Sequence, residues 1–351
     1  MKIAVDCSKL NTEKKTGTHR FLTGFLEELS KRKDIELTFY FNYLDKKLVN
    51  YPFLKKGDIK ILETKLYTQL GLLKEIEKFD YFIFPWQTVP VLSFFTQGNA
   101  IAIIHDSGYT FKTKFFTFLA QIFAKVIFSV SESTRKSLLR NSFVITEGVD
   151  EKIFYKIKED DLRKLKLQHG LPEKFLLSVG RIEERKNIFN NIKAFSKISK
   201  FYPNLKYCFI GNFEIEDKLI YSFINSLDIN PDQIIFKNYV DDEVLNLYLN
   251  SCEFLIFTSQ DEGFGLPVLE AYSIGKWVVL SEIQQLAEFV LSAKQVVPHN
   301  NPQEIASTIV YFLTNKLKLK KEFNPSDLLK KFSWKNSVDL FLEKLESYDR
   351  K

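Results

Sequence analysis

Residues 253–280 read EFLIFTSQDEGFGLPVLEAYSIGKWVVL, and this stretch predicts a strand, an acidic turn with two glycines, a helix and a second strand. The apolar run at residues 253–258 has the length of a buried parallel strand. Gly263 and Gly265 mark the turn. Pro267 suits the first helical position, because a missing N–H is no loss there. We therefore expect a strand-turn-helix unit in which the helix begins at this turn.

The same turn is a predicted anion-binding site, because the first N–H groups of a helix have no intrahelical partner and the helix dipole favours negative charge. The amides that we expect to point at such an anion belong to Gly263, Phe264, Gly265 and Leu266. Glu262 and Glu270 flank the turn and can accept hydrogen bonds from hydroxyl groups. Either glutamate alone is also explained by an ordinary strand-turn-helix, in which Glu262 is solvated and Glu270 complements the helix dipole.

A second candidate site follows the apolar run at residues 175–179, where the chain continues GRIEERKN. Arg181 and Lys186 are the cations that we expect to stabilise a phosphate leaving group, because an Arg fork and a Lys point charge suit concentrated negative charge. Asn187 is the expected cap of the next helix. A solvated charged loop is the alternative for these cations.

The first half of the chain offers two weaker candidates. Gly17 lies in TGTHR, at the expected start of a helix, where glycine allows close approach of a phosphate or sugar. A plain helix start explains it equally well. His105 follows the apolar strand at residues 100–104 in the sequence IHD, which places it at a strand C-terminus. A structural histidine is the alternative there.

Strand and helix patterns alternate along the whole chain, which predicts an α/β fold with mostly parallel sheets and helices on both faces. Expected strands of the first half lie at residues 3–7, 35–41, 81–84, 100–104, 125–130 and 143–146. The lysine-rich, acidic residues 149–172 are the expected linker, after which the alternation resumes at residue 174. The result is two doubly wound domains with a cleft between them. An amphipathic helix is expected in the tail, at residues 332–348.

Composition bounds the class of protein. The chain has 351 residues, 45% hydrophobic and 27% charged, which is typical of globular domains. Three isolated cysteines and an N-terminal apolar run interrupted by Asp6 predict a reducing, cytoplasmic location. Residues 115–130 are too short to span a membrane and are expected to form a buried helix and a strand. The net charge of +6 is spread along the chain, without a nucleic-acid-binding module.

The motifs together resemble one family. TGTHR, IHD, SVGRIEERKNIFNNIKAF and EGFGLPVLEA, with two glutamates eight apart, are similar to the sequence elements of retaining GT-B glycosyltransferases of family GT4. The resemblance implies two Rossmann-like domains that face each other across a cleft. It places residues 1–155 in an acceptor-binding domain and residues 171–333 in a nucleotide-sugar donor-binding domain. It also implies that a terminal helix, about residues 334–351, returns to the first domain.

The resemblance further implies the reaction and the roles of residues. The expected enzyme is a hexosyltransferase that moves mannose or another hexose from an NDP-sugar to a saccharide or lipid-linked saccharide, for cell-surface polysaccharide or glycoconjugate synthesis. Glu270 would hold the donor ribose, Glu262 the sugar hydroxyls, and Arg181 with Lys186 the diphosphate. Gly17 would close on the diphosphate, and His105 would lie against the sugar.

The same resemblance predicts that no metal or other cofactor is needed, because two cations and a helix terminus neutralise the phosphates. Residues 44–73 and 111–123 are expected at the acceptor surface, with peripheral contact to the cytoplasmic side of an inner membrane. Two alternatives stay open: a GT-B nucleotide-sugar epimerase, and a non-catalytic GT-B subunit that only binds a partner.

Overall fold

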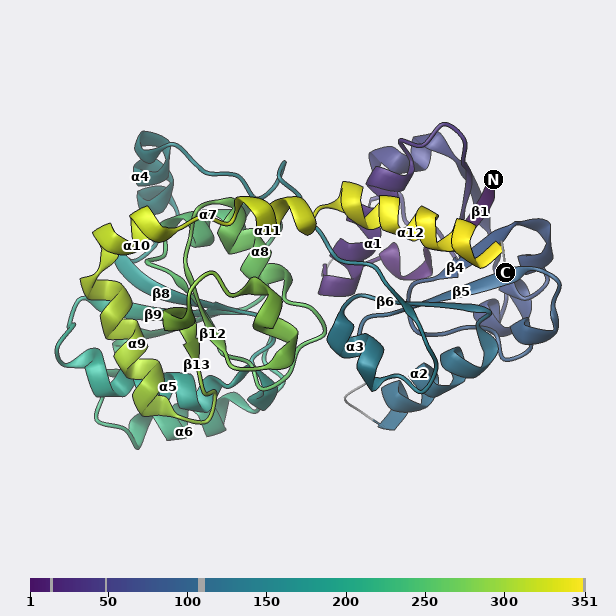
Figure 1. Cartoon of the computed structure of the whole chain (residues 1–351). Coiled ribbons are helices and arrows are strands. Elements are labelled where there is room, and N and C mark those ends of the chain that lie inside the picture. The colour runs from purple at the N-terminus through teal and green to yellow at the C-terminus, as the bar shows by residue number, and fades with distance from the viewer. Residues whose placement is uncertain (13–14, 48, 107–110, 350–351) are drawn as a thin grey trace. The chain divides into compact units, whose positions relative to one another are not determined.

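Two parallel sheets organise the chain, one in each of two units (Figure 1). The computed structural model describes residues 1–12, 15–47, 49–106 and 111–349. The first unit comprises Met1–Gly148 and Phe332–Lys351, and the second comprises Val149–Lys331.

The sheet of the first unit has seven strands in the order β3-β2-β1-β4-β5-β6-β7, and every pair is parallel. Its strands are β1 (Lys2–Asp6), β2 (Glu36–Phe41), β3 (Asp58–Ile61), β4 (Tyr81–Phe84), β5 (Asn99–Ile104), β6 (Val126–Ser129) and β7 (Phe143–Val144). The central strands are almost continuously apolar, as expected for a sheet covered on both faces.

Helices α1 (Gly17–Leu29), α2 (Phe111–Phe123), α3 (Glu132–Ser137) and α12 (Trp334–Asp349) belong to the first unit. Successive residues of β6 point to opposite faces: Ile127 joins the core under α2, while the Phe128 ring lies 4.8 Å from that of Phe341 on α12. At Gly24 of α1 an added Cβ would lie 2.2 Å from the Trp334 indole, so α12 packs directly on α1 (Figure 1). The predicted return of the terminal helix to the first unit is confirmed.

The sheet of the second unit has six parallel strands in the order β10-β9-β8-β11-β12-β13. Its strands are β8 (Lys174–Val179), β9 (Leu205–Ile210), β10 (Ile234–Lys237), β11 (Leu255–Phe257), β12 (Val278–Ser281) and β13 (Val296–Val297). Its helices are α4 (Glu159–Gln168), α5 (Ile188–Ser199), α6 (Asp217–Asn225), α7 (Asp242–Ser251), α8 (Leu266–Ser273), α9 (Pro302–Thr314), α10 (Lys316–Glu322) and α11 (Ser326–Lys331).

The strand order reverses at one point in each sheet, between β1 and β4 in the first and between β8 and β11 in the second. Doubly wound sheets bind ligands beyond the carboxyl ends of the strands at such a point, because the flanking helices depart to opposite faces and leave room. The candidate residues of each unit follow strands at or beside this point. The α/β, doubly wound class predicted from the sequence is confirmed.

Residues 149–172, predicted to be a linker, all belong to the second unit. Helix α4 lies within them and packs against α7. The Asn250 amide on α7 accepts from the Ile157 N–H at 3.0 Å and donates to the Tyr155 carbonyl at 3.1 Å. The unit boundaries therefore fall at 148/149 and 331/332, near the predicted domain limits of 155 and 333, whereas the predicted start at 171 leaves α4 out of the second unit. The sequence did not reveal that α4 belongs to the second unit, because α4 has no buried residue and hence no apolar face.

Two further expectations for the first unit were incomplete or wrong. Strand β3 was not predicted, because all four of its residues are exposed at the sheet edge and lack the apolar signature of the inner strands. Helix α2 was expected to be buried, but its Phe111, Phe115 and Phe118 are exposed. A hydrophobic helix in this chain thus presents aromatic side chains to the surface.

Candidate functional site in the second unit and the residues of the first

The loop after β8 carries the predicted cations. A short 3-10 helix, η6 (Glu184–Lys186), follows Arg181 and leads directly into α5. Arg181 and Lys186 both line a small hollow at the carboxyl ends of β8 and β11, together with Phe257 and Ser259. A larger hollow lies at the amino end of the same sheet, against Phe254, and contains none of the predicted site residues.

Asn187 occupies the N-cap position of α5, as predicted, but its side chain does not cap the helix. It adopts a left-handed conformation, with φ 61°, and donates instead to the His299 carbonyl at 2.7 Å. On α5, Asn191 accepts from the Thr258 hydroxyl at 2.6 Å, which ties the start of α5 to the end of β11. This polar network fixes η6 beside the acidic turn.

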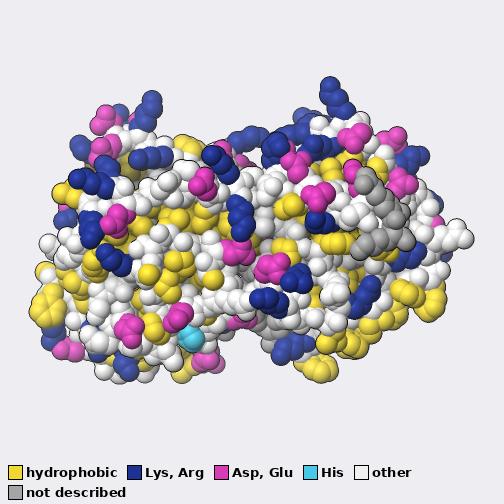
Figure 2. All heavy atoms as spheres, viewed as in Figure 1, with side chains coloured by type: hydrophobic (Ala, Val, Ile, Leu, Met, Phe, Trp, Pro, Cys, Tyr) yellow, Lys and Arg dark blue, Asp and Glu magenta, His cyan; other side chains and the backbone are white. Residues whose placement is uncertain are grey.

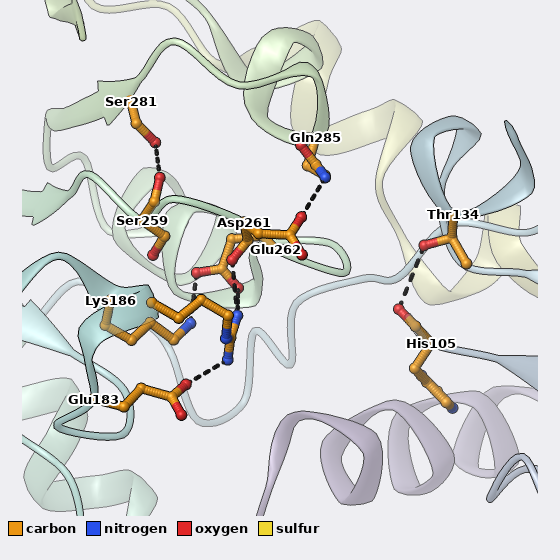
Figure 3. Close-up of polar contacts among 10 residues, drawn as sticks. His105, Thr134, Glu183, Lys186, Ser259, Asp261, Glu262, Ser281 and Gln285 are labelled. Carbon is orange, nitrogen blue, oxygen red and sulfur yellow. Dashed lines mark hydrogen bonds and ion pairs between the residues drawn. The ribbon is translucent and has the colours of Figure 1, made fainter. Parts of the chain in front are cut away.

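Lys186 and Glu262 form the centre of the site, as Figure 3 shows. The Lys186 Nζ lies 2.5 Å from Glu262 Oε1, and both side chains are mostly buried, with 18% and 8% of their surfaces exposed. The same ammonium lies 5.1 Å above the centre of the Phe257 ring. Because the pair is largely removed from water, its charges interact more strongly than a surface pair would.

Arg185 completes this cluster and was not among the residues chosen from the sequence. Its guanidinium lies 3.5 Å from Glu262 Oε2, donates to the Asp261 carbonyl at 2.8 Å and pairs with Glu183 at 2.6 Å. Two cations thus face two carboxylates beside the turn. The only signal in the sequence was the run RIEERK itself, which does not show which of its cations point toward Glu262.

Arg181 lies apart from this cluster. Its guanidinium is 3.7 Å from Glu214, and the two side chains are 59% and 48% exposed. Such a solvent-exposed pair is weak. The structure therefore brings together Lys186 and Glu262 from the predicted set, with Arg185 added, whereas Arg181 lines the hollow without contacting Glu262.

The GFGLP turn is held in place by packing. Gly265 has φ 125°, a conformation that other residues rarely adopt, and an added Cβ would lie 3.1 Å from Leu286 and 3.2 Å from Phe289. The Phe264 ring packs against Phe289 with 5.3 Å between ring centres. Helix α8 begins at Leu266, so Pro267 occupies its second position rather than the first. Among the residues that the structure describes, no side chain caps this N-terminus, so it is suited to an external anion.

Glu270 lies in α8 and is 2% exposed. It therefore belongs to the interior of the second unit, whereas Glu262 faces the cations Lys186 and Arg185. A carboxylate buried to this degree is retained only where polar partners compensate the loss of hydration. The two glutamates share one turn-helix unit but have different surroundings.

Gly17 of the first unit is the first residue of α1, and the Thr16 hydroxyl caps that helix by accepting from the His19 N–H at 3.4 Å. An added Cβ at Gly17 would meet no atom within 4 Å. Packing in the described part of the chain does not require glycine here, in contrast to Gly265. Its predicted role at a ligand stays a prediction.

His105 follows β5, and its imidazole is packed inside the first unit. Its Nε2 lies 3.1 Å from the Pro85 carbonyl, its Nδ1 lies 3.8 Å from Glu147, and the Phe21 ring meets it edge-on at 4.8 Å. Burial raises the pKa of Glu147. Both ring nitrogens thus face protein acceptors, and Glu147, which follows the predicted strand at residues 143–146, is a partner that the sequence did not reveal.

The architecture defines a class of protein before any relative is considered. Two Rossmann-like units whose sheets share the order of six strands, one of which carries cations and a carboxylate beside a helix N-terminus, correspond to the GT-B fold. Residues 160–326 match the family described as "Glycosyl transferases group 1". The chain thus carries a domain of the glycosyl transferases group 1 family, and this domain contains every predicted site residue of the second unit.

Known proteins support this assignment. The chain is 27% identical over 279 residues to the serotype-specific mannosyltransferase WbdA of Escherichia coli, and the match covers 74% of this chain and 33% of WbdA. The chain thus spans about a third of that relative's length. The fold of this chain is similar to that of Anabaena HepE, which was solved with UDP and glucose, with a TM-score of 0.78 and 17% identity. That match covers 99% of this chain and 100% of HepE. A sucrose-phosphate synthase from Thermosynechococcus elongatus has a TM-score of 0.75, with 16% identity and full coverage of both chains, 100% each.

Proposed function

We propose that this protein is a retaining hexosyltransferase of family 4 that transfers mannose or a similar hexose from a nucleoside diphosphate to a saccharide or lipid-linked saccharide. The observation that carries the proposal is the Lys186–Glu262 pair at the carboxyl ends of β8 and β11, beside the uncapped N-terminus of α8. Anions bind where a fixed cation and helix amides converge. A carboxylate in the same place selects a ligand that also carries hydroxyl groups.

The chemistry that this arrangement supports is departure of a diphosphate. The bond between the anomeric carbon and the phosphate oxygen breaks, and the nucleoside diphosphate leaves with the electron pair. The acceptor hydroxyl forms the new bond on the same face of the sugar, and its proton passes to the departing phosphate. Charge builds up on that phosphate as the bond breaks, so Lys186 and the α8 amides stabilise the transition state more than the ground state.

Glu262 has a second role in this proposal. An ionised carboxylate offers about four acceptor positions, and Lys186 and Arg185 use one oxygen each at 2.5 and 3.5 Å. The remaining positions accept hydrogen bonds from hydroxyls of the transferred sugar. Glu270 would hold the ribose and Arg181 the outer phosphate, while Gly17 and His105 of the first unit keep their predicted roles at the diphosphate and the sugar.

The relatives support a saccharide product, because the similar protein WbdA is a mannosyltransferase and the similar structure of HepE contains UDP and glucose. We propose that the chain acts in cell-surface polysaccharide or glycoconjugate synthesis on the cytoplasmic side of a membrane. Metal independence belongs to the same proposal, because Lys186 and Arg185 provide positive charge without a divalent ion.

A two-stage experiment tests the proposal. Thermal shift with UDP, GDP and dTDP, and with their hexose conjugates, identifies the donor, because a ligand that binds only the folded state raises Tm. Release of nucleoside diphosphate from that donor is then measured with and without an oligosaccharide acceptor and with EDTA. Acceptor-dependent release that persists in EDTA supports a metal-independent transferase. Conversion of the donor sugar without acceptor would indicate an epimerase, and no binding of any donor would refute both.

A further inference from the structure

Helix α2 of the first unit exposes its hydrophobic face, whereas an ordinary surface helix buries it. Phe111, Phe115, Phe118 and Ile122 lie at spacings of four, three and four residues, so they share one face, and this face is exposed. Their exposed fractions are 88%, 49%, 44% and 42%. The buried face contains the polar residues Thr117 and Gln121. Its most hydrophobic face therefore points outward.

The polar residues on the buried face of α2 are satisfied, so this orientation is built into the fold. The Gln121 side chain donates to the Thr117 carbonyl at 3.3 Å and accepts from the Leu139 N–H at 2.6 Å. Arg140 donates to the Gln121 carbonyl at 2.5 Å. A rotation of α2 that hid its phenylalanines would break these bonds and bury unpaired polar groups.

A neighbouring segment extends the apolar face. The 3-10 helix η5 (Ser93–Phe95) is tied to the end of α2 by the Ser93 hydroxyl, which donates to the Phe123 carbonyl at 2.9 Å. Phe94 and Phe95 in η5 are 53% and 77% exposed. The α2–η5 surface is thus made of Phe94, Phe95, Phe111, Phe115, Phe118 and Ile122. Figure 2 shows hydrophobic side chains gathered along α2 at the lower edge of this unit.

The charge on α2 and at its carboxyl end is positive, whereas the acidic Glu77 lies beside η5 and accepts from the Gln97 N–H at 2.9 Å. Lys112 and Lys114 are exposed on α2 itself, and Arg140 lies against the carboxyl end of the helix. No residue in the sequence ranges 86–98, 111–123 and 136–146 is acidic. Exposed aromatic side chains beside the cations of α2 match the interface of an anionic lipid bilayer, where the rings enter the headgroup region and the cations meet the phosphates.

We propose that the α2–η5 surface is a peripheral docking site for membranes rich in anionic phospholipid. Across the described residues, every helix is too short or too polar to cross a bilayer. The 13 residues of α2 span about 20 Å, which is shorter than the hydrocarbon core of a bilayer, about 30 Å. The helix would therefore lie in the membrane interface. A second copy of the chain fits the surface poorly, because a twofold contact would bring Lys112 and Lys114 of both copies together. The inference does not depend on the transfer reaction.

The test is co-sedimentation of the full chain with vesicles of phosphatidylglycerol and phosphatidylcholine, compared with phosphatidylcholine alone. We expect binding only to the anionic vesicles and its loss in 0.5 M NaCl, because salt screens the cations. Phe115→Ser with Phe118→Ser should weaken binding about tenfold or more. Lys112→Glu with Lys114→Glu should weaken it about tenfold or more, because each cation contributes about fivefold.

Matched variants in the second unit provide the controls. Phe201 and Leu317 are 80% and 82% exposed, and serine at both positions removes comparable apolar surface. Lys193 and Lys197 are exposed on α5, and glutamate at both positions makes the same change of charge. These variants should sediment like the wild type, and all variants should keep the wild-type Tm and nucleotide binding.

Three results would overturn the proposal. One is equal sedimentation with neutral and anionic vesicles, or with neither. Another is unchanged binding by both the phenylalanine and the lysine variants. The third is a wild-type dimer that the phenylalanine variant dissociates while vesicle binding is absent, which would assign the surface to a second copy. Loss of nucleotide binding with vesicle binding intact would instead count against the proposed function alone.

Discussion

The two sheets share the order of six strands, but the residues at their carboxyl edges differ in chemistry. In the second unit the edge holds Lys186, Arg185 and Glu262, a charged cluster that remains partly open to solvent. In the first unit His105 follows β5 and is enclosed by Phe21, Pro85 and Glu147. The strand order determines where a ligand site can form, whereas local packing determines whether the side chains there are available to a ligand.

Replacement of Lys186 in the cluster should weaken nucleotide binding far more than replacement of the exposed Arg181. This is the largest effect that we expect. Lys186→Met leaves Glu262 without its closest partner, so we expect the Kd of the nucleoside diphosphate to rise about 10- to 100-fold. Arg181→Met removes only an exposed pair and should raise it about threefold or less. Isothermal titration calorimetry measures both. Equal losses in the two variants would show that Arg181 belongs to the core of the site.

The two predicted glycine sites provide a second contrast. Gly265→Ala forces a side chain into a positive φ and against Leu286 and Phe289, so we expect it to destabilise the second unit by about 2 kcal/mol. Gly17→Ala, in open space on α1, should stabilise the first unit by up to about 1 kcal/mol. Urea unfolding checks both free energies. A Gly17→Ala protein that is stable but binds donor poorly would support close approach of a ligand at Gly17.

Replacement of His105 tests whether this residue, at the carboxyl edge of the first unit's sheet, stabilises the fold or binds the ligand. His105→Leu removes the contacts with the Pro85 carbonyl and Glu147, and we expect a loss of about 1–2 kcal/mol in the free energy of unfolding. Donor Kd should change little if the imidazole acts only within its own unit. Weaker donor binding by the folded variant would instead support the proposed role of His105 at the sugar.

Glu147 should give the smallest effect, visible as a pH dependence. Burial raises the folded-state pKa of this carboxyl above that of the unfolded chain, so its contribution to stability is present at low pH and is lost as pH rises through the folded pKa. Glu147→Gln cannot ionise. The Tm of the variant relative to wild type should therefore increase from pH 4 upward. A difference that stays constant or shrinks with pH would contradict the raised pKa.

Most strands were predicted within one or two residues, because inner parallel strands are short apolar runs between turn residues. Strand β4 matches its expected bounds, whereas the exposed edge strand β3 was missed. Helix α4 was mistaken for a linker because it has no buried residue. Periodicity detects an element only when one of its faces is buried against the core.

The site was predicted in part. Lys186 and Glu262 were both chosen from the sequence and are neighbours in the structure although they are 76 positions apart, because each follows a strand that ends at the same edge of the sheet. The role of Arg181 at the diphosphate stays a prediction: Arg181 lines the hollow and lies near Glu214, whereas η6 turns the Arg185 side chain toward Glu262. Side chains of a strand alternate between two faces, so their direction can be predicted from the sequence. Side chains of a loop follow no such period.

The sequence alone determined the α/β class, the two successive doubly wound halves and the position of the acidic turn before α8, since hydrophobic periodicity, glycines and proline act locally along the chain. Only the tertiary structure decided that Arg185 joins Lys186 at Glu262, that Glu147 faces His105, and that α2 presents its phenylalanines outward. These depend on which elements pack together, and the contacts join residues far apart in the chain.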